Sequence, residues 1–308
     1  MTKVKVSFEW LSGCSGCELS IVDLHDRLLD VLDAIELVRI PILMDVKDYP
    51  KATLGIVTGA LKTVHDVHAA HAMRESCDKI LAFGVCAVYG GPQGCGYAHG
   101  PGELEKAVFQ DNPTTRTHFI PNEGVPEVLP EGVRPIDSEI DVDLYLPGCP
   151  PHPYYVAQAL KAVIDGSEPE FGAHNVCFRC NRNMQRSEVV ALRRSHDGPV
   201  APDTCFLSQG ILCMGSVTLD RCLAPCPQNG VACSGCAGPS EHVILEPQLD
   251  IRTEIADRIS RMTHIKRDDV VREIEKQSKT LYAYAMASPV FRQKPTFLLR
   301  HWLAPKES

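Results

Sequence analysis

Several features that would place a sequence in a class at once are missing from this chain of 308 residues. No run of about 18 apolar residues occurs, so we expect no membrane span. The start, Met1-Thr-Lys-Val-Lys, has neither an apolar signal segment nor a twin-arginine pair, which predicts a soluble, cytoplasmic protein. Lysine and arginine are dispersed and the formal net charge is −8, which argues against a nucleic-acid partner.

Cysteine, by contrast, is abundant, with 14 residues. Hydrophobic residues make up 44% of the chain, which allows one large or two modest domains with a hydrophobic core. In a reducing cytosol, clustered cysteines favour metal binding over disulfides. Twelve of the cysteines fall into three sets of four, which suits either zinc or iron–sulfur clusters and matches the arithmetic of three four-iron clusters.

The three sets occupy different parts of the chain. The first set lies in the motifs Trp10-Leu-Ser-Gly-Cys-Ser-Gly-Cys-Glu18, Gly84-Val-Cys-Ala-Val-Tyr-Gly-Gly91 and Pro147-Gly-Cys-Pro-Pro151, and consists of Cys14, Cys17, Cys86 and Cys149. The other two sets lie within residues 177–236 and consist of Cys177, Cys180, Cys205 and Cys213, and of Cys222, Cys226, Cys233 and Cys236.

The first half of the chain alternates between short apolar runs and stretches with helical spacing of hydrophobic residues. Strands are predicted over residues 3–8, 36–40, 54–57, 79–84 and 141–146, and helices over 18–32, 62–76 and 152–164. This alternation predicts an α/β fold with an open parallel sheet in a flavodoxin-like order. We expect that domain to span residues 1–168, a smaller irregular or helical cluster-binding domain to span 169–240, and a helical C-terminal extension to span 241–308.

The first set of cysteines follows the strands of that sheet. Cys14 and Cys17 come after the first strand, Cys86 after the fourth and Cys149 after the fifth. All four therefore occupy loops at the carboxyl ends of parallel strands, the edge at which doubly wound sheets bind ligands. Thiols that are far apart in the sequence are predicted to converge there on one site.

The motifs C-S-G-C-E, G-V-C-A-V-Y-G-G and P-G-C-P-P, in this order and spacing, resemble the small, electron-transferring subunit of nickel–iron hydrogenases. The resemblance implies that the first set holds a proximal cluster. It also implies a distal cluster at the second set and a medial cluster at the third. That family uses His-x-x-Cys and two more cysteines at the distal cluster, and three cysteines and a proline at the medial one. Here Cys177 stands at the histidine position, and an additional cysteine supplies a fourth medial ligand.

Four thiolates favour a four-iron cluster of low potential, so we expect three [4Fe-4S] clusters. Within the family, this resembles the cytoplasmic, methanogen-type hydrogenase that does not reduce deazaflavin, the methyl-viologen-reducing type. The resemblance implies three partners: a nickel–iron large subunit, a [2Fe-2S] electron-transfer subunit and heterodisulfide reductase. No Cys/His arrangement resembles a nickel site, so dihydrogen cleavage is expected in the large subunit and no catalytic residue in this chain.

Some residues allow two interpretations. Glu18 either relays protons near the partner's metal site or is a first-turn glutamate favoured by the helix dipole. Thr58 stands where the family commonly has glutamate, which puts an acidic role at that position in doubt. His174 and Cys177 form a His-x-x-Cys motif, so a distal site with His174 as a ligand is the alternative to the all-cysteine distal set.

Cys95 competes with Cys86 as third proximal ligand, whereas Cys77 is expected to be a small buried hydrophobic residue. The histidines at positions 65, 68 and 71 are expected on a solvated helix face. For the whole chain, one alternative is a single-cluster subunit of a complex that resembles respiratory NADH:quinone oxidoreductase, which shares the P-G-C-P-P turn. The other alternative is a structural zinc protein.

Two long segments lie outside these motifs. Residues 89–139 are rich in glycine and proline and contain one short helical stretch around 103–109, and we expect this connection to cover a large partner. Residues 249–262 and 268–277 show helical apolar spacing. These helices are expected to pack either on the cluster domain of this chain or on a partner.

Overall fold

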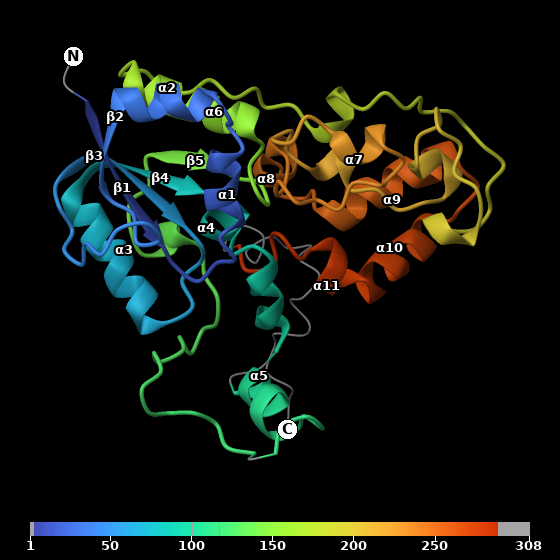
Figure 1. Ribbon diagram of the computed structural model, residues 1–308. Helices are drawn as coiled ribbons and strands as arrows, with labels where there is room; N and C mark the ends of the chain where they lie inside the picture. The colour runs from blue at the N-terminus through green and yellow to red at the C-terminus, as the bar shows by residue number, and fades with distance from the viewer. Residues whose placement is uncertain (1–2, 100–101, 117, 289–308) are drawn as a thin grey trace.

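A computed structural model describes residues 3–99, 102–116 and 118–288, which form two lobes (Figure 1). The first lobe contains a sheet of five parallel strands in the order β2-β1-β3-β4-β5, which confirms the predicted flavodoxin-like α/β fold. The strands are β1 (Val4–Trp10), β2 (Ile35–Arg39), β3 (Ala52–Thr58), β4 (Cys77–Phe83) and β5 (Leu144–Leu146).

Helices cover both faces of the sheet. One face packs against α1 (Gly16–Val22), α2 (Arg27–Ala34) and α6 (Pro153–Ile164), and the other against α3 (Val64–Ser76) and α4 (Val85–Tyr89). In β3, Leu54 and Ile56 join the first of these cores and Val57 joins the second. Because both faces are covered, β3 is buried at all but one position, and residues 6–9 of β1 are buried as well.

Two predicted elements differ from the structure in extent. The predicted helix 18–32 is divided into α1 and α2, because the backbone turns between them and His25 has a positive φ of 52°, which no continuous α-helix accepts. The last strand is shorter than predicted, since the side chain of Asp143 accepts a hydrogen bond from the Ile80 N–H at 2.7 Å just before β5 begins. The start of α3 has a capping box formed by Thr63 and Asp66.

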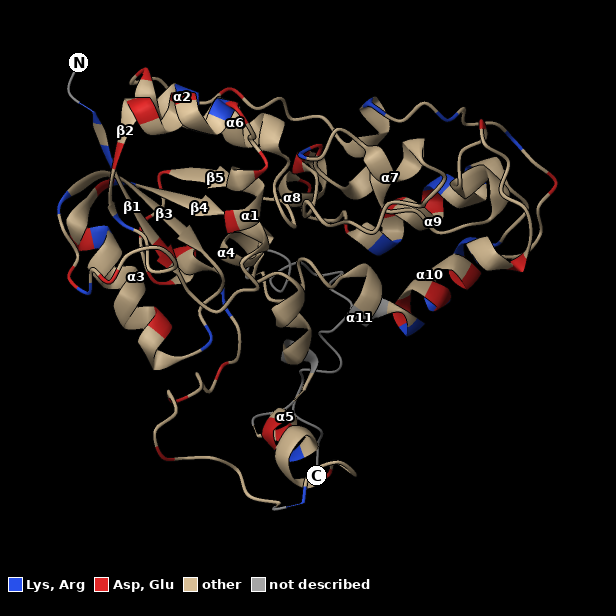
Figure 2. Ribbon diagram, viewed as in Figure 1, with Lys and Arg blue, Asp and Glu red and all other residues tan. Residues whose placement is uncertain are grey.

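The second lobe contains little regular structure before residue 241. Its short 3-10 helices are Val176–Phe178, Ser195–Asp197, Leu207–Gln209 and Gly215–Val217, followed by α7 (Pro225–Gln228) and α8 (Glu241–Leu245). The longer helices α9 (Ile251–Met262) and α10 (Arg267–Lys276) come next, with α11 (Ser278–Leu281). Acidic and basic residues are mixed along α10 rather than separated by sign (Figure 2).

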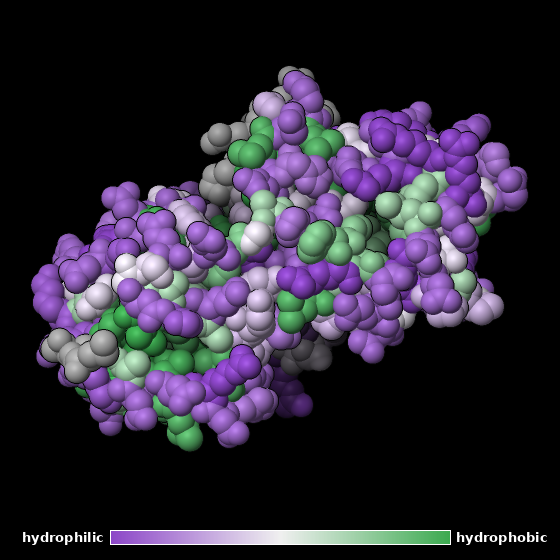
Figure 3. Space-filling model, turned by 90° about the horizontal axis from the view of Figure 1, so that it is seen from above, coloured by the Kyte–Doolittle hydropathy of each residue, from purple (hydrophilic) through white to green (hydrophobic). Residues whose placement is uncertain are grey.

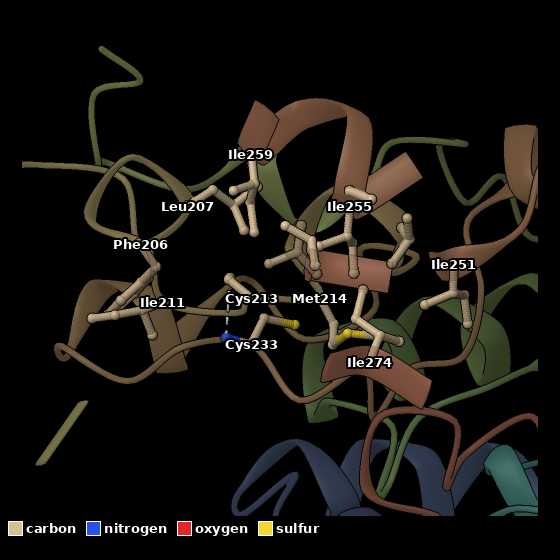
Figure 4. Packing of buried hydrophobic residues seen from close by; sticks show 14 of the residues in the cluster. Phe206, Leu207, Ile211, Cys213, Met214, Cys233, Ile251, Ile255, Ile259 and Ile274 are labelled. Atoms are coloured by element: carbon tan, nitrogen blue, oxygen red, sulfur yellow. Dashed lines mark hydrogen bonds between the residues drawn. The ribbon is translucent and has the colours of Figure 1, made fainter. Parts of the chain in front are cut away.

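Helix α9 supplies one side of the hydrophobic core of this lobe. Ile251, Ile255 and Ile259 are buried on one stripe of α9 and belong to the same cluster as Phe206 and Met214 (Figure 4). The C-terminal helices therefore pack on the cysteine-rich segment of this chain. This is the first of the two arrangements that the sequence predicted, the other being packing on a partner.

The chain then returns to the first lobe. A Cβ placed on Gly90 would lie 2.6 Å from the Ala287 Cβ, and the Cys95 Sγ lies 3.9 Å from the Ala283 carbonyl oxygen. The long connection after α4 contains the 3-10 helices Pro92–Ala98 and Ile136–Ser138, and α5 (Glu103–Glu105) continued by a π-helical turn, Lys106–Gln110. Nowhere in the described ranges does a helix have the length and apolar character needed to cross a membrane.

Candidate metal centres

The first set of cysteines converges at the carboxyl edge of the sheet. Cys14 and Cys17 lie on the loop from β1 and the start of α1, Cys86 lies on α4 directly after β4, and Cys149 follows β5. All four line one cavity of about 170 Å³. Trp10 and Glu18 line it as well. The predicted convergence of these thiols is therefore found in the structure.

Two glycines make room for these thiols. Gly84 has a φ of 90°, and a Cβ there would collide with the Cys17 Sγ. Gly91 has a φ of 56°, and a Cβ there would lie 2.5 Å from the Cys86 Sγ. A side chain at either position would be strained and would displace a thiol, so the local backbone is shaped around the cysteines.

The electrostatics of the cavity suit a metal group. Burial raises the pKa of Cys86 to about 12, and the neighbouring Cys149 and Cys14 add to the rise. Burial also raises the pKa of Cys17 well above its ordinary value, followed by the effects of Glu18 and the other three thiols. Thiolates so close together and so poorly hydrated need a bound cation to balance their charge. Four soft sulfur donors around one cavity fit an iron–sulfur cluster.

Thr58 is a residue at this site whose role the sequence did not reveal. Its Oγ1 donates a hydrogen bond to the Glu18 Oε1, while the Glu18 Oε2 is buried and has no hydrogen-bond partner in the described part of the chain. The contact arises because Thr58 ends β3 opposite Trp10 of β1, so it lies beside the loop that leads to α1. A prediction of the register between β1 and β3 would have placed Thr58 beside this loop.

A buried ion pair lies near the end of β1, next to this edge of the sheet. Glu9 and Arg39 are both nearly inaccessible, and their side chains meet at 2.9 Å. The Tyr49 hydroxyl donates to the same Glu9 oxygen at 2.8 Å. Burial, then the hydrogen bond to Glu9, raises the pKa of Tyr49 to about 12, so its hydroxyl keeps its proton at neutral pH. It anchors the end of β1 from which the cysteine loop departs.

The cysteines of the second set influence each other's ionisation. Burial raises the pKa of Cys177 to about 12, and Cys213, Cys205 and Cys180 contribute in that order. A Cβ on Gly215 would lie 3.4 Å from the Cys177 Sγ and 3.6 Å from the Cys213 Sγ. These four thiols therefore lie close together in the second lobe.

The third set lies between the other two. Burial raises the pKa of Cys236 to about 12, with further contributions from Cys222, Cys149 and Cys226. Cys236 thus has neighbours in its own set and one in the first set. On the other side, the Cys233 N–H donates to the Cys213 Sγ of the second set at 3.3 Å (Figure 4).

The competing residues occupy other positions. The exposed His174 ring stacks on Phe178, with centroids 3.9 Å apart. Cys95 is not among the residues that line the first cavity, whereas Cys86 is. Cys77 is buried under α3 beside Met73, as expected of a small hydrophobic residue.

The histidines at positions 65, 68 and 71 lie on α3, where no contact with a cysteine set is found among the described residues. Within the ranges that the structure describes, no three Cys, His, Asp or Glu side chains are arranged to hold a single metal ion.

Comparisons with known proteins extend over both lobes. A family described as "NADH ubiquinone oxidoreductase, 20 Kd subunit" matches residues 14–163. An F420-non-reducing hydrogenase subunit (vhu) of Methanocaldococcus jannaschii is 39% identical over 239 residues, which are 77% of this chain and 83% of that protein. The corresponding F420-non-reducing hydrogenase subunit of Methanothermobacter marburgensis is 31% identical over 302 residues, 95% of this chain and 97% of that protein.

A solved structure is similar to about half of this chain. It is a chain of the NAD+-reducing [NiFe]-hydrogenase in the H2-reduced state, with a TM-score of 0.53 and 30% identity. The match covers 56% of this chain and 96% of that chain. The F420-non-reducing hydrogenase subunit of Methanothermobacter marburgensis matches 95% of this chain, so that likeness extends into the cysteine-rich second lobe.

Proposed function

The chain belongs to the family of F420-non-reducing hydrogenase small subunits, which are small subunits of nickel–iron hydrogenases, and from this premise we propose that it relays electrons through three [4Fe-4S] clusters. An iron–sulfur cluster supplies one-electron chemistry, and the protein sets its potential through charge, hydrogen bonds to sulfur and exclusion of water. The chain's own residues hold, space and shield these groups.

Cys14, Cys17, Cys86 and Cys149 are the proposed ligands of the proximal cluster. Their convergence on one cavity at the carboxyl edge of the sheet is the observation that carries the proposal. The glycines at positions 84 and 91 support it, because they leave the space that thiolate ligands need.

The other two sets form the proposed distal and medial sites. We assign Cys177, Cys180, Cys205 and Cys213 to the distal cluster, and Cys222, Cys226, Cys233 and Cys236 to the medial one. The electrostatic influence of Cys149 on Cys236 and the hydrogen bond from the Cys233 N–H to the Cys213 Sγ support the order proximal, medial, distal. A series of neighbouring sites is the arrangement that an electron relay requires.

The proposed main partner is a nickel–iron large subunit placed over the proximal site. Trp10, Leu19 and Val22 lie at or just beyond the cavity and are 42%, 62% and 59% exposed. Figure 3 shows a separate group of hydrophobic residues on the upper face of the sheet lobe, at the end away from the second lobe. Large apolar side chains beside a cluster site favour a protein partner that excludes water from it.

Electrons would leave from the distal site in the second lobe. The all-thiolate distal and medial sets favour low potentials, which suits transfer to a [2Fe-2S] subunit and heterodisulfide reductase. Dihydrogen would be oxidised in the large subunit, and this relay would carry the electrons from there.

Glu18 is the proposed proton relay beside the proximal site. One of its carboxylate oxygens is held by Thr58, and the other is buried without a hydrogen-bond partner in the described residues. Glu18→Gln should keep the iron content and slow dihydrogen oxidation by about 100-fold or more, whereas Glu18→Asp should recover part of the rate. Equal rates for Glu18→Gln and the unmodified protein would contradict the relay.

Metal counting tests the three-cluster proposal. After anaerobic purification with its partner subunits, the chain should carry about 12 iron atoms from three four-iron clusters and little zinc. A count near four iron atoms would favour the alternative, a single-cluster subunit of an NADH:quinone oxidoreductase-like complex. The family match to residues 14–163 is the observation behind that alternative. A zinc-dominated preparation would contradict both.

A single substitution tests the medial ligands. Cys226→Ala should remove or convert the medial four-iron EPR signal and leave the other two. Cys77→Ala is the matched control, because Cys77 is a buried cysteine of the sheet core and lies outside all three sets. An unchanged medial signal in Cys226→Ala would show that the ligand assignment is wrong.

A further inference from the structure

Arg221 is a buried arginine at the junction of the two lobes. It is 7% exposed, and its guanidinium carbon lies 5.5 Å from the Tyr155 ring centroid and 5.1 Å from that of Phe171. Tyr155 belongs to α6 of the first lobe, and Phe171 lies on the connection into the second. The positive charge is therefore held between aromatic rings instead of water.

The charge of Arg221 is not neutralised by a carboxylate in the described part of the chain. Its Nη1 donates to the carbonyl oxygens of Gly172 at 2.9 Å and Asp220 at 2.8 Å, and its buried Nε has no partner there. The Asp220 carboxylate is only 3% exposed and is paired with the Arg179 Nε at 2.5 Å. Glu241, the other acidic residue that influences Arg221, is exposed to solvent. The Arg221 guanidinium thus forms no ion pair with a carboxylate among the described residues.

The backbone of Arg221 lies where the first and third cysteine sets meet. Arg221 immediately precedes Cys222, and its carbonyl oxygen accepts a hydrogen bond from the His152 N–H at 3.3 Å. His152 follows Cys149 by three residues, and Cys149 is one of the groups that raise the pKa of Cys236. The residue therefore connects the backbone of the proximal turn to the backbone of the medial set.

We propose that Arg221 is a positioning residue whose buried positive charge raises the reduction potential of the medial cluster. This inference rests on the proposed function. Reduction of a cluster adds one negative charge, and a cation nearby stabilises the reduced form more than the oxidised form. The effect is strong where water is excluded, because the local dielectric constant is low. Arg221 offsets part of the negative charge that the four medial thiolates impose.

Burial of a guanidinium without a carboxylate partner is costly, and the two aromatic rings offset only part of that cost. A purely structural clamp between the lobes would need the contacts of Arg221 but not its charge. Charge and contacts can be separated by substitution. Arg221→Lys keeps the positive charge but loses the planar guanidinium group, whereas Arg221→Gln loses both the charge and the guanidinium group.

Arg193→Gln is a matched control in the second lobe. The Arg193 guanidinium also donates to backbone carbonyls, those of Gln209, Gly198 and Pro199, but it lies on a segment away from Cys222. The substitution removes the same formal charge from the chain. It therefore reports any effect of net charge alone.

The experiment is an EPR-monitored redox titration of the whole complex, with iron counted in every variant. The medial signal is the one altered by Cys226→Ala. Arg221→Gln should shift the midpoint potential of that signal to a more negative value and leave the distal signal in place. Arg221→Lys should stay near the unmodified protein, and Arg193→Gln should not shift the medial signal.

An unshifted medial potential in Arg221→Gln with full iron content would overturn the inference, as would equal shifts in Arg221→Gln and Arg221→Lys. Absence of a medial cluster in the unmodified complex would instead contradict the proposed function. Should Arg221→Gln fail to assemble, Arg221→Met supplies a second neutral variant, because its unbranched apolar side chain can lie between the same two rings. It should shift the medial potential to a more negative value. No shift there would also overturn the inference.

Discussion

The two lobes differ in how deeply their proposed ligand cysteines lie within the hydrophobic core. In the first lobe, Cys14 is exposed and the proximal cavity lies at the edge of a sheet whose core consists of aliphatic and aromatic residues. In the second lobe, Cys213 and Cys233 are themselves members of the core around α9 (Figure 4). A metal group in the first lobe would therefore lie at the edge of the sheet, outside its hydrophobic core. In the second lobe, a metal group would be bound by cysteines that belong to the core.

The difference also appears in the backbone. The first lobe has five paired strands, whereas the segment from Val176 to Gln228 has only short helical turns and isolated bridges among its described residues. Regular hydrogen bonding stabilises the sheet without any ligand. Metal binding and folding are expected to be coupled in the second lobe, because its thiols would otherwise remain buried without partners.

Removal of iron should produce the largest difference in stability between the two lobes. After chelation under reducing conditions, we expect amide hydrogens of residues 176–233 to exchange rapidly while those of β1, β3 and β4 remain protected. Hydrogen exchange followed by mass spectrometry measures this difference. Restored protection after addition of iron and sulfide is the control, and simultaneous loss of protection in both lobes would contradict the comparison.

Loss of one proposed ligand should have different structural costs in the two lobes. Cys14→Ser and Cys213→Ser should each lose about four iron atoms, but only Cys213→Ser should also destabilise its lobe, by about 1–3 kcal/mol, because it buries a hydroxyl in an apolar core. Iron analysis and thermal unfolding measure the two effects. Cys77→Ser, the control, should lose stability and keep its iron. Equal destabilisation by Cys14→Ser and Cys213→Ser would contradict the proposed difference between the two lobes.

Core truncation should sharpen the comparison further. Ile56→Ala in β3 and Ile255→Ala in α9 each remove a fully buried side chain, and each should cost about 2–5 kcal/mol in urea unfolding. Ile255→Ala should in addition speed the loss of iron to a chelator, since it loosens the core that contains Cys213 and Cys233. Faster iron loss in Ile56→Ala than in Ile255→Ala would reverse the proposed roles.

The smallest expected effect is a pH dependence confined to the sheet. Partial burial acts to raise the pKa of Asp143, but the hydrogen bond from Ile80 N–H and the ion pair with Arg74 outweigh it and lower the pKa. Asp143 therefore stabilises the fold above its ordinary pKa, and this contribution disappears as the pH falls through the lowered value.

Asp143→Asn should consequently reduce the free energy of unfolding at neutral pH by no more than about 1 kcal/mol, because the side chain is 40% exposed. The deficit should vanish in acid. Chemical unfolding measured across the acidic range tests this, with exchange of the second-lobe amides unchanged throughout. A deficit that grows in acid would show that the sign is wrong.

Most of the sheet lobe could be predicted because its strands and helices have distinct periodic patterns. The strand order and the convergence of Cys14, Cys17, Cys86 and Cys149 follow from parallel strands whose carboxyl ends share one edge. The division of the helix at residues 23–26 could not be predicted, since the apolar spacing continues across His25 although its backbone leaves the helical region. Periodicity records burial and does not record a local turn.

The amino-acid pattern was enough to specify the parallel sheet and the edge at which the first set of cysteines gathers, whereas the assignment of the twelve cysteines as ligands stays a prediction. Three interactions needed the folded chain: Cys149 influences the ionisation of Cys236, the Cys233 N–H donates to the Cys213 Sγ, and the Arg221 guanidinium lies against the rings of Tyr155 and Phe171. These interactions join irregular segments that are far apart in the chain. Such segments have no repeating pattern, so only the packing of the whole molecule brings them together.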